Sequence, residues 1–253
     1  EAKVHLVTCA NSAVKNIEKC IKNCGLSVDG FVLEQLASSH SILSEDEKEL
    51  GVCLVDIGGG TTDIAIFNSG SIVFTGVIPI AGDQVTSDIA QALRTPTPQA
   101  EEIKQKHGCS VTEFTKDDES IEVPGVGGRP TRELSRSSLA DIIQPRYTEL
   151  FELVKAEITR NGFEEKISAG IVFTGGTSKM EGVVELAESI FQTSVRLGIP
   201  NKFSGMESIL QNPIYATSIG LVDHGFKQMN DDLIAEQSQS WISKLLKIVK
   251  SEY

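Results

Sequence analysis

Apolar and polar positions are most sharply segregated between residues 52 and 67. Val52–Val55 and Ile64–Phe67 are two short apolar runs, and the residues between them are polar and rich in glycine. Apolar runs of four residues separated by a short polar segment are typical of buried strands joined by a tight turn. The pattern therefore predicts a β-hairpin, and Asn68-Ser-Gly70 predicts a second turn into an antiparallel strand over 71–79.

The rest of the chain alternates between strand-like and helix-like patterns, which indicates an α/β fold. The acidic run 44–49 is expected to be a solvated loop, because acidic side chains are readily hydrated. Before the hairpin we expect strands at 4–9 and 31–33 and helices at 13–24 and 36–43. After it we expect helices at 85–93, 99–106, 139–161 and 181–191, short strands within 109–123, and an apolar strand that enters Gly175.

The polar segment of the hairpin carries candidate chemistry. Three consecutive glycines let the backbone adopt conformations closed to other residues, so that neighbouring N–H groups can form an anion-binding concavity. Asp56, at the end of the first strand, offers the oxygen chemistry that Mg²⁺ prefers, and we expect it to hold the ion through water. A glycine-rich turn without a ligand is the alternative. The candidate phosphate-site residues are Asp56, Gly58, Gly59, Gly60, Thr61, Thr62 and Asp63.

Two further patterns fit a nucleotide beside this hairpin. An apolar strand runs into Gly175-Gly176 and continues through Lys179 towards a helix, which lets a flat base or a sugar approach the backbone. Glu101 and Lys104 lie three residues apart on one face of a predicted helix, within reach of a ribose hydroxyl and an adenine edge. The structural alternatives are an ordinary strand-to-helix turn and a surface ion pair.

Composition narrows the classes of function. The chain has 253 residues, of which 40% are hydrophobic and 23% charged, as in a globular protein with a substantial core. Its net charge of −12 argues against binding nucleic acid, which requires a basic surface. Five cysteines at irregular spacing favour reduced thiols over a disulfide framework. Because the chain starts directly in a strand-like run without Met, we expect a further N-terminal portion.

Residues 241–253 have the pattern of an amphipathic helix behind a polar linker at 230–240. At about 100° per residue, one broad face is apolar and the other carries lysines. Such a helix is typical of attachment to an anionic membrane surface, whereas docking on the protein's own core is the alternative. The apolar face comprises Trp241, Ile242, Leu245, Leu246, Ile248 and Val249, and the basic face comprises Lys244, Lys247 and Lys250.

These motifs resemble a known superfamily. Asp56-Ile-Gly-Gly-Gly-Thr-Thr-Asp63 resembles the second phosphate-binding hairpin of actin-like ATPases, and Val172-Phe-Thr-Gly-Gly176 resembles their adenosine motif. Together with Val85-Thr-Ser-Asp-Ile-Ala90, Val126-Gly-Gly-Arg-Pro130 and Pro145-Arg-Tyr-Thr-Glu-Leu150, they are similar to FtsA, a family of actin-like bacterial cell-division proteins. The likeness covers essentially the whole chain. The family's first phosphate hairpin and its domain 1C would precede residue 1.

The resemblance implies an actin-like (ribonuclease H-like) ATPase domain with an inserted α+β subdomain and a C-terminal amphipathic helix. It implies a remnant of domain 1A with an interdomain connection at 1–50, and a nucleotide-binding domain 2A at 51–87 and 161–229. The inserted subdomain 2B would occupy 88–160, the linker 230–240 and a membrane-targeting helix 241–253.

The resemblance also implies a function. ATP and Mg²⁺ would lie between the hairpin and Gly175-Gly176, with at most slow hydrolysis, because no residue stands out as a general base. The protein would form actin-like filaments with itself and tether FtsZ filaments to the cytoplasmic side of the bacterial inner membrane at the septum, as a peripheral protein that meets other division proteins. The residues that would receive the C-terminal tail of FtsZ are Arg132, Arg146 and Glu149, although solvated arginines in local ion pairs are the alternative.

Other functions within the superfamily remain open at this point. A PilM-like scaffold for pilus assembly would lack the basic amphipathic tail. A sugar-kinase-like phosphotransferase would need a catalytic carboxylate and a sugar pocket between two complete domains. A P-loop enzyme is excluded, because the chain contains no Gly-x-x-x-x-Gly-Lys-Ser/Thr segment.

Overall fold

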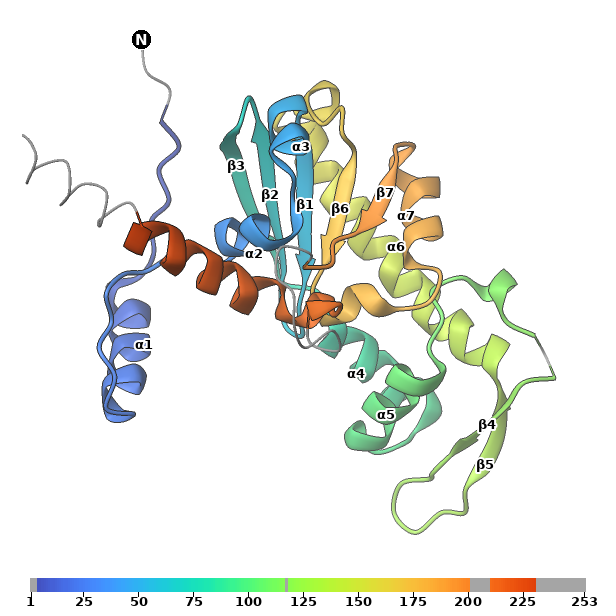
Figure 1. Cartoon of the computed structure of the whole chain (residues 1–253). Coiled ribbons are helices and arrows are strands. Elements are labelled where there is room, and N and C mark those ends of the chain that lie inside the picture. The colour runs from blue at the N-terminus through green and yellow to red at the C-terminus, as the bar shows by residue number, and fades with distance from the viewer. Residues whose placement is uncertain (1–3, 117, 201–209, 231–253) are drawn as a thin grey trace, which may run out of the picture.

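A five-stranded sheet forms the middle of the molecule in the computed structural model, which describes residues 4–116, 118–200 and 210–230 (Figure 1). The strand order is β3-β2-β1-β6-β7. β1 pairs antiparallel with β2, and β2 with β3, whereas β6 runs parallel to β1 and β7. The strands are β1 (Val52–Ile57), β2 (Thr62–Asn68), β3 (Ser71–Ile78), β6 (Ile171–Thr174) and β7 (Val195–Leu197).

Helices connect the strands and cover both faces of the sheet. The predicted hairpin, the strand that follows it and the four downstream helices are confirmed, with ends shifted by a few residues. The helices are α1 (Asn11–Asn23), α2 (Glu34–Ile42), α3 (Glu45–Leu50), α4 (Gly82–Leu93), α5 (Thr97–His107), α6 (Arg136–Arg160) and α7 (Val183–Phe191). Short 3-10 turns are η1 (Thr112–Phe114), η2 (Glu164–Lys166), η3 (Gly176–Lys179) and η4 (Pro213–Tyr215), and residues 216–230 are helical.

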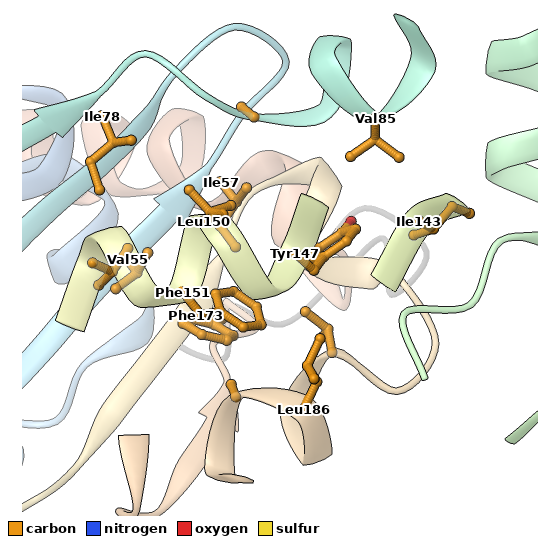
Figure 2. Close-up of a cluster of buried hydrophobic side chains, with 14 of the residues drawn as sticks. Val55, Ile57, Ile78, Val85, Ile143, Tyr147, Leu150, Phe151, Phe173 and Leu186 are labelled. Atoms are coloured by element: carbon orange, nitrogen blue, oxygen red, sulfur yellow. The ribbon is translucent and has the colours of Figure 1, made fainter. Parts of the chain in front are cut away.

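The two faces of the sheet belong to two cores because successive residues of a strand point to opposite sides. Val55 and Ile57 of β1 face the larger core beneath α4, α6 and α7, whereas Leu54 faces a smaller core shared with α2 and the helix at 216–230. α6 lies across the sheet with Phe151 stacked on Phe173 of β6, the ring centroids 5.1 Å apart (Figure 2). Packing on both faces therefore fixes β1, the strand that ends in the predicted phosphate turn.

The segment between α5 and α6 carries a small sheet of its own. β4 (Ser120–Val123) pairs antiparallel with β5 (Arg132–Ser135), apart from the five-stranded sheet. Ile121 and Val123 are nevertheless buried in the larger core. Among the described residues of 109–123, β4 is the only one of the predicted short strands that forms. The proposed division into subdomains stays a prediction.

Three predictions upstream of β1 are wrong. Residues 4–9 and 31–33 form no strand, and Leu6 and Phe31 are 82% and 53% exposed. A strand needs a partner for its backbone N–H and C=O groups, and no described strand pairs with these segments. The acidic run is not a loop but α3, because Ser44 and Glu47 form a capping box and acidic side chains stabilise a helix N-terminus.

Other sequence features have simple places in the structure. The five cysteines are free thiols, of which Cys53 and Cys109 are buried. Within the described ranges, no helix combines the length and the apolar character needed to cross a membrane. The predicted linker, except for its first residue, and the amphipathic helix at 241–253 lie outside the described residues.

Candidate functional site

The glycine turn lies at the carboxyl end of β1. The Gly58 N–H donates to the carbonyl of Thr61 at 3.0 Å and closes the turn, so this amide is used within the protein. Gly59 and Gly60 are exposed, and their N–H groups have no partner among the described residues. The turn therefore leaves the amides of Gly59 and Gly60 for an anion.

Two hydroxyls predicted for the site stabilise the turn. Thr62 is fully buried, and its Oγ1 donates to the carbonyl of Ile80 at 2.7 Å. Thr61 Oγ1 donates to Asp63 Oδ2 at 3.0 Å. The Thr62 hydroxyl is thus a structural group, whereas Thr61 is exposed at the tip.

Asp56 is buried directly before the turn, with 7% of its surface exposed. Burial raises its pKa and the charge of Asp63 raises it further, whereas a hydrogen bond from Ser38 Oγ, 3.0 Å from Asp56 Oδ2, opposes both. An ideal Cβ on Gly175 would lie 2.5 Å from Asp56 Oδ1. Glycine at position 175 therefore lets the second predicted motif meet the Asp56 carboxylate.

Further polar groups gather behind Asp63 on α2. Gln35 Nε2 donates to Asp63 Oδ1 at 2.9 Å, while Gln35 Oε1 is buried and has no hydrogen-bond partner in the part of the chain that the structure describes. Burial raises the pKa of Glu34, and the charges of Asp56 and Asp63 raise it further. These carboxylates concentrate negative charge, so a polyphosphate here requires a cation.

The first turn of α4 lies directly against the glycine turn. The N–H groups of Gly82 and Asp83 donate to the carbonyls of Gly58 and Gly59, at 3.2 and 2.8 Å. Thr177 Oγ1 also donates to the Gly58 carbonyl, at 2.7 Å. An ideal Cβ on Gly59 would lie 3.4 Å from Asp83 Oδ1, which places that carboxylate beside the tip of the turn. The end of β1, the start of α4 and η3 therefore meet at the backbone of Gly58 and Gly59.

The predicted Glu101–Lys104 pair lies next to this convergence. Lys104 Nζ is 2.7 Å from Glu101 Oε2, and it also donates to the carbonyl of Gly82 and to Thr86 Oγ1, at 3.0 and 2.8 Å. Burial opposes ionisation of Glu101, but hydrogen bonds from Lys104 and Thr86 outweigh it and lower the pKa. The pair is therefore more than a surface ion pair, because Lys104 is anchored at the start of α4.

The second glycine motif has an apolar neighbour that the sequence did not reveal. An ideal Cβ on Gly176 would lie 3.4 Å from Ile214 Cγ1, and Ile214 is 51% exposed. Thr174 Oγ1 donates to the carbonyl of Pro213 and holds η4 in place. An exposed apolar side chain beside a bare backbone offers a surface for a flat ring. Lys179 lies at the exposed end of η3, and no described side chain forms an ion pair with it.

The arginines predicted for a protein partner bond α4 beyond its first turn. Arg146 forms a two-point ion pair with Asp88 of α4, at 2.6 and 3.0 Å, and its third nitrogen bonds Glu149. Hydrogen bonding to Asp88 raises the pKa of Arg146. Arg132 donates to the carbonyl of Leu93, the last residue of α4, at 2.7 Å. Both arginines are thus held by one helix.

The described residues contain no group of three or more His, Cys, Asp or Glu side chains placed to hold a metal ion. Mg²⁺ in a nucleotide site does not require one, because it keeps several waters and uses one or two carboxylates together with phosphate oxygens. Asp56 and Asp83 supply carboxylate oxygens on either side of the glycine turn. These residues would hold Mg²⁺ through water, where the ion would offset charge on a polyphosphate.

Several site residues were not predicted from the sequence. Most of them are single residues outside the predicted motifs. Three have a signal in the sequence: Asp83 follows a glycine at a strand-to-helix junction, Thr86 lies within Val85–Ala90, and Thr177 directly follows Gly176. The residues are Glu34, Gln35, Ser38, Asp83, Thr86, Thr177 and Ile214.

The fold is actin-like, as its similarity to solved structures shows. The structure of MreB5 of Spiroplasma citri bound to AMPPNP is similar, with a TM-score of 0.74 and 20% identity over 90% of this chain and 68% of that one. A PilM–PilN type IV pilus biogenesis complex matches with a TM-score of 0.66 and 18% identity, over 84% of this chain and 57% of that one.

Sequence comparison identifies the family. The profile of the cell division protein FtsA matches residues 53–220, and the chain belongs to the FtsA family. It is 60% identical over 240 residues to the FtsA of Pseudomonas aeruginosa, covering 95% of this chain and 58% of that protein. It is 46% identical over 266 residues to the FtsA of Escherichia coli K12, covering 100% and 63%. The chain thus spans about three fifths of the length of these relatives.

Proposed function

We propose that the chain is the ATP-binding part of an FtsA-type division protein. The observation that carries the proposal is the convergence of the Gly59-Gly60 amides, the start of α4 and the Gly175-Gly176 turn beside Glu101–Lys104. Phosphates would meet the glycine amides, Mg²⁺ would lie by Asp56 and Asp83, and the ribose would meet Glu101. The base would lie against the surface that Gly176 and Ile214 form together. The AMPPNP bound by MreB5 supports the same ligand class.

ATP would act mainly as an assembly ligand. Hydrolysis would be slow. Glu34 is the candidate to orient the attacking water, because it is an exposed carboxylate at the start of α2, close enough to Asp56 and Asp63 for their charges to raise its pKa. Family membership supports a role in filaments at the division septum, with FtsZ and other division proteins as partners. The FtsZ tail would bind at Arg132, Arg146 and Glu149.

Membrane attachment would be supplied by residues 241–253. A single short amphipathic helix binds lipid weakly and reversibly, so a filament with many tails would attach where a monomer scarcely does. The protein would therefore be peripheral on the cytoplasmic side of the inner membrane and would tether FtsZ filaments there.

Nucleotide binding is tested by titrating full-length protein with MgATP in a calorimeter. Asp56→Asn should abolish saturable binding, whereas Asp46→Asn, which changes an exposed residue of α3, should bind as the wild type does. Equal affinity of both variants would overturn the proposed site.

The two attachment functions are tested separately. Removal of residues 241–253 should abolish co-sedimentation with anionic liposomes, and equal pelleting would refute the tether. Arg146→Glu should abolish capture by an FtsZ tail peptide, whereas Arg160→Glu on the exposed side of α6 should not. Equal capture would remove Arg146 from the FtsZ site.

A further inference from the structure

α4 makes contacts with both proposed sites. At its start, the Gly82 and Asp83 amides bond the glycine turn, and the Gly82 carbonyl and Thr86 receive Lys104. Further along, Asp88 holds Arg146 and the Leu93 carbonyl holds Arg132. One helix of 12 residues therefore touches the nucleotide contacts at one end and both proposed partner arginines beyond them.

The Asp88–Arg146 pair is better defined than an ordinary surface ion pair. The Arg146 and Asp88 side chains are 26% and 29% exposed, and the carboxylate meets the guanidinium at two nitrogens. Such two-point pairs fix orientation as well as charge. By contrast, Arg160 and Glu157 on the same α6 pair through one guanidinium nitrogen, with Arg160 72% exposed.

Asp88 leaves part of Arg146 available. A guanidinium has five N–H donors, and the hydrogen bonds to Asp88 and Glu149 use three of them. Each terminal nitrogen therefore keeps one N–H that an incoming carboxylate can accept, while Asp88 holds the Nε–Nη2 edge. Because Asp88 belongs to α4, a shift of the Arg146 guanidinium on binding a carboxylate would act on that helix.

We propose that Asp88 is a positioning residue that orients Arg146 for a partner carboxylate and, through α4, couples partner binding to nucleotide binding. The proposal rests on the nucleotide and partner sites of the proposed function and adds a regulatory link between them. Val85, Thr86, Ile89 and Leu93 are buried along α4, so the helix moves as a packed unit rather than bending locally.

The test measures the affinity of full-length protein for an FtsZ tail peptide, with and without MgATP. In the wild type the two affinities should differ about fivefold or more, the range typical of coupled sites. Asp88→Asn should bring the ratio of the two peptide affinities, with and without MgATP, to about one. Asp88→Glu should partly restore the wild-type ratio. Glu157→Gln removes the carboxylate of an ion pair from α6 without touching α4, and it should keep the wild-type ratio.

Arg146→Lys is the second variant, because lysine keeps the charge but cannot form the two-point pair. It too should lose the coupling, and thermal unfolding of each variant establishes that it is folded. A folded Asp88→Asn or Arg146→Lys protein with the wild-type ratio would overturn the proposal, as would a wild-type ratio of one.

Failure of the proposed function gives a different result. A wild type that binds no peptide would refute the partner site, and a wild type that binds no MgATP would refute the nucleotide site. If the wild type binds no peptide, the coupling of Asp88 to the nucleotide site can still be measured through the affinity for MgATP. Asp88→Asn should change that affinity severalfold, and Glu157→Gln should not. Unchanged MgATP affinity in Asp88→Asn would then overturn the link itself.

Discussion

Gly175→Ala should be among the most damaging single-methyl substitutions in this protein. Gly175 has φ 86° and ψ 166°, a backbone region essentially reserved for glycine. An ideal Cβ there would lie 2.4 Å from the carbonyl oxygen of Ile57 and 2.5 Å from Asp56 Oδ1. The added methyl group would therefore strain the backbone and press on the end of β1.

The magnitude follows from two terms. The backbone conformation costs about 1–3 kcal/mol for a residue with a Cβ, and overpacking against a rigid neighbour costs about 1–3 kcal/mol more. We expect the free energy of unfolding to fall by about 4 kcal/mol. Gly162→Ala is the matched control: Gly162 also has a positive φ, of 69°, but a Cβ there would meet nothing within 4 Å. Its cost should be about 1–2 kcal/mol.

Urea denaturation of both variants measures the difference. We expect the free energies of unfolding of the two variants to differ by about 2–3 kcal/mol. This difference measures the cost of placing a methyl group where the second glycine turn approaches β1 and Asp56. Should Gly175→Ala unfold within about 1 kcal/mol of Gly162→Ala, below the overpacking range, the contact that joins the two glycine motifs would be disproved.

Three further predictions concern the acidic groups of the site. Burial raises the pKa of Asp56 above its unfolded value of about 3.9, so ionisation of Asp56 destabilises the nucleotide-free fold. In urea denaturation, Asp56→Asn should therefore become more stable relative to the wild type as the pH rises from about 3.9 through the raised pKa, with no such gain below about pH 3.9. A gain that shrinks as the pH rises would contradict this. Glu101→Gln should weaken MgATP binding about tenfold, as expected for loss of a charged hydrogen bond, whereas the exposed Glu102→Gln should not; calorimetry distinguishes them. Glu34→Gln should slow single-turnover hydrolysis by about 10²-fold with unchanged MgATP affinity, and an unchanged rate would remove Glu34 as the general base.

The local pattern of the chain was sufficient for the parts of the fold that depend on neighbours in sequence. The hairpin over 52–67 follows from two apolar runs and a glycine turn, and β1 and β2 pair as predicted, with Asp56 opposite Asp63. α6 forms across Pro145 because its buried side is apolar along its length.

The predictions failed where contacts with distant segments, or hydrogen bonds that cap a helix, decide the local structure. The run 4–9 is strand-like, yet the described residues offer it no strand partner. α3 forms because Ser44 and Glu47 cap it and Arg196, far along the chain, pairs with Glu47. Ser38 and Gln35 of α2 reach Asp56 and Asp63 only through tertiary packing, so no spacing in the sequence could reveal them.

The central claim is that the glycine turn, the start of α4 and the Gly175-Gly176 turn together hold one nucleotide beside the Glu101–Lys104 pair. Amide hydrogen exchange of full-length protein, with and without MgATP, tests it most directly. We predict slower exchange on adding MgATP at 58–62, at 82–86 and at 175–177 together. Protection at the last two segments with unchanged exchange at Gly59 and Gly60 would contradict the claim.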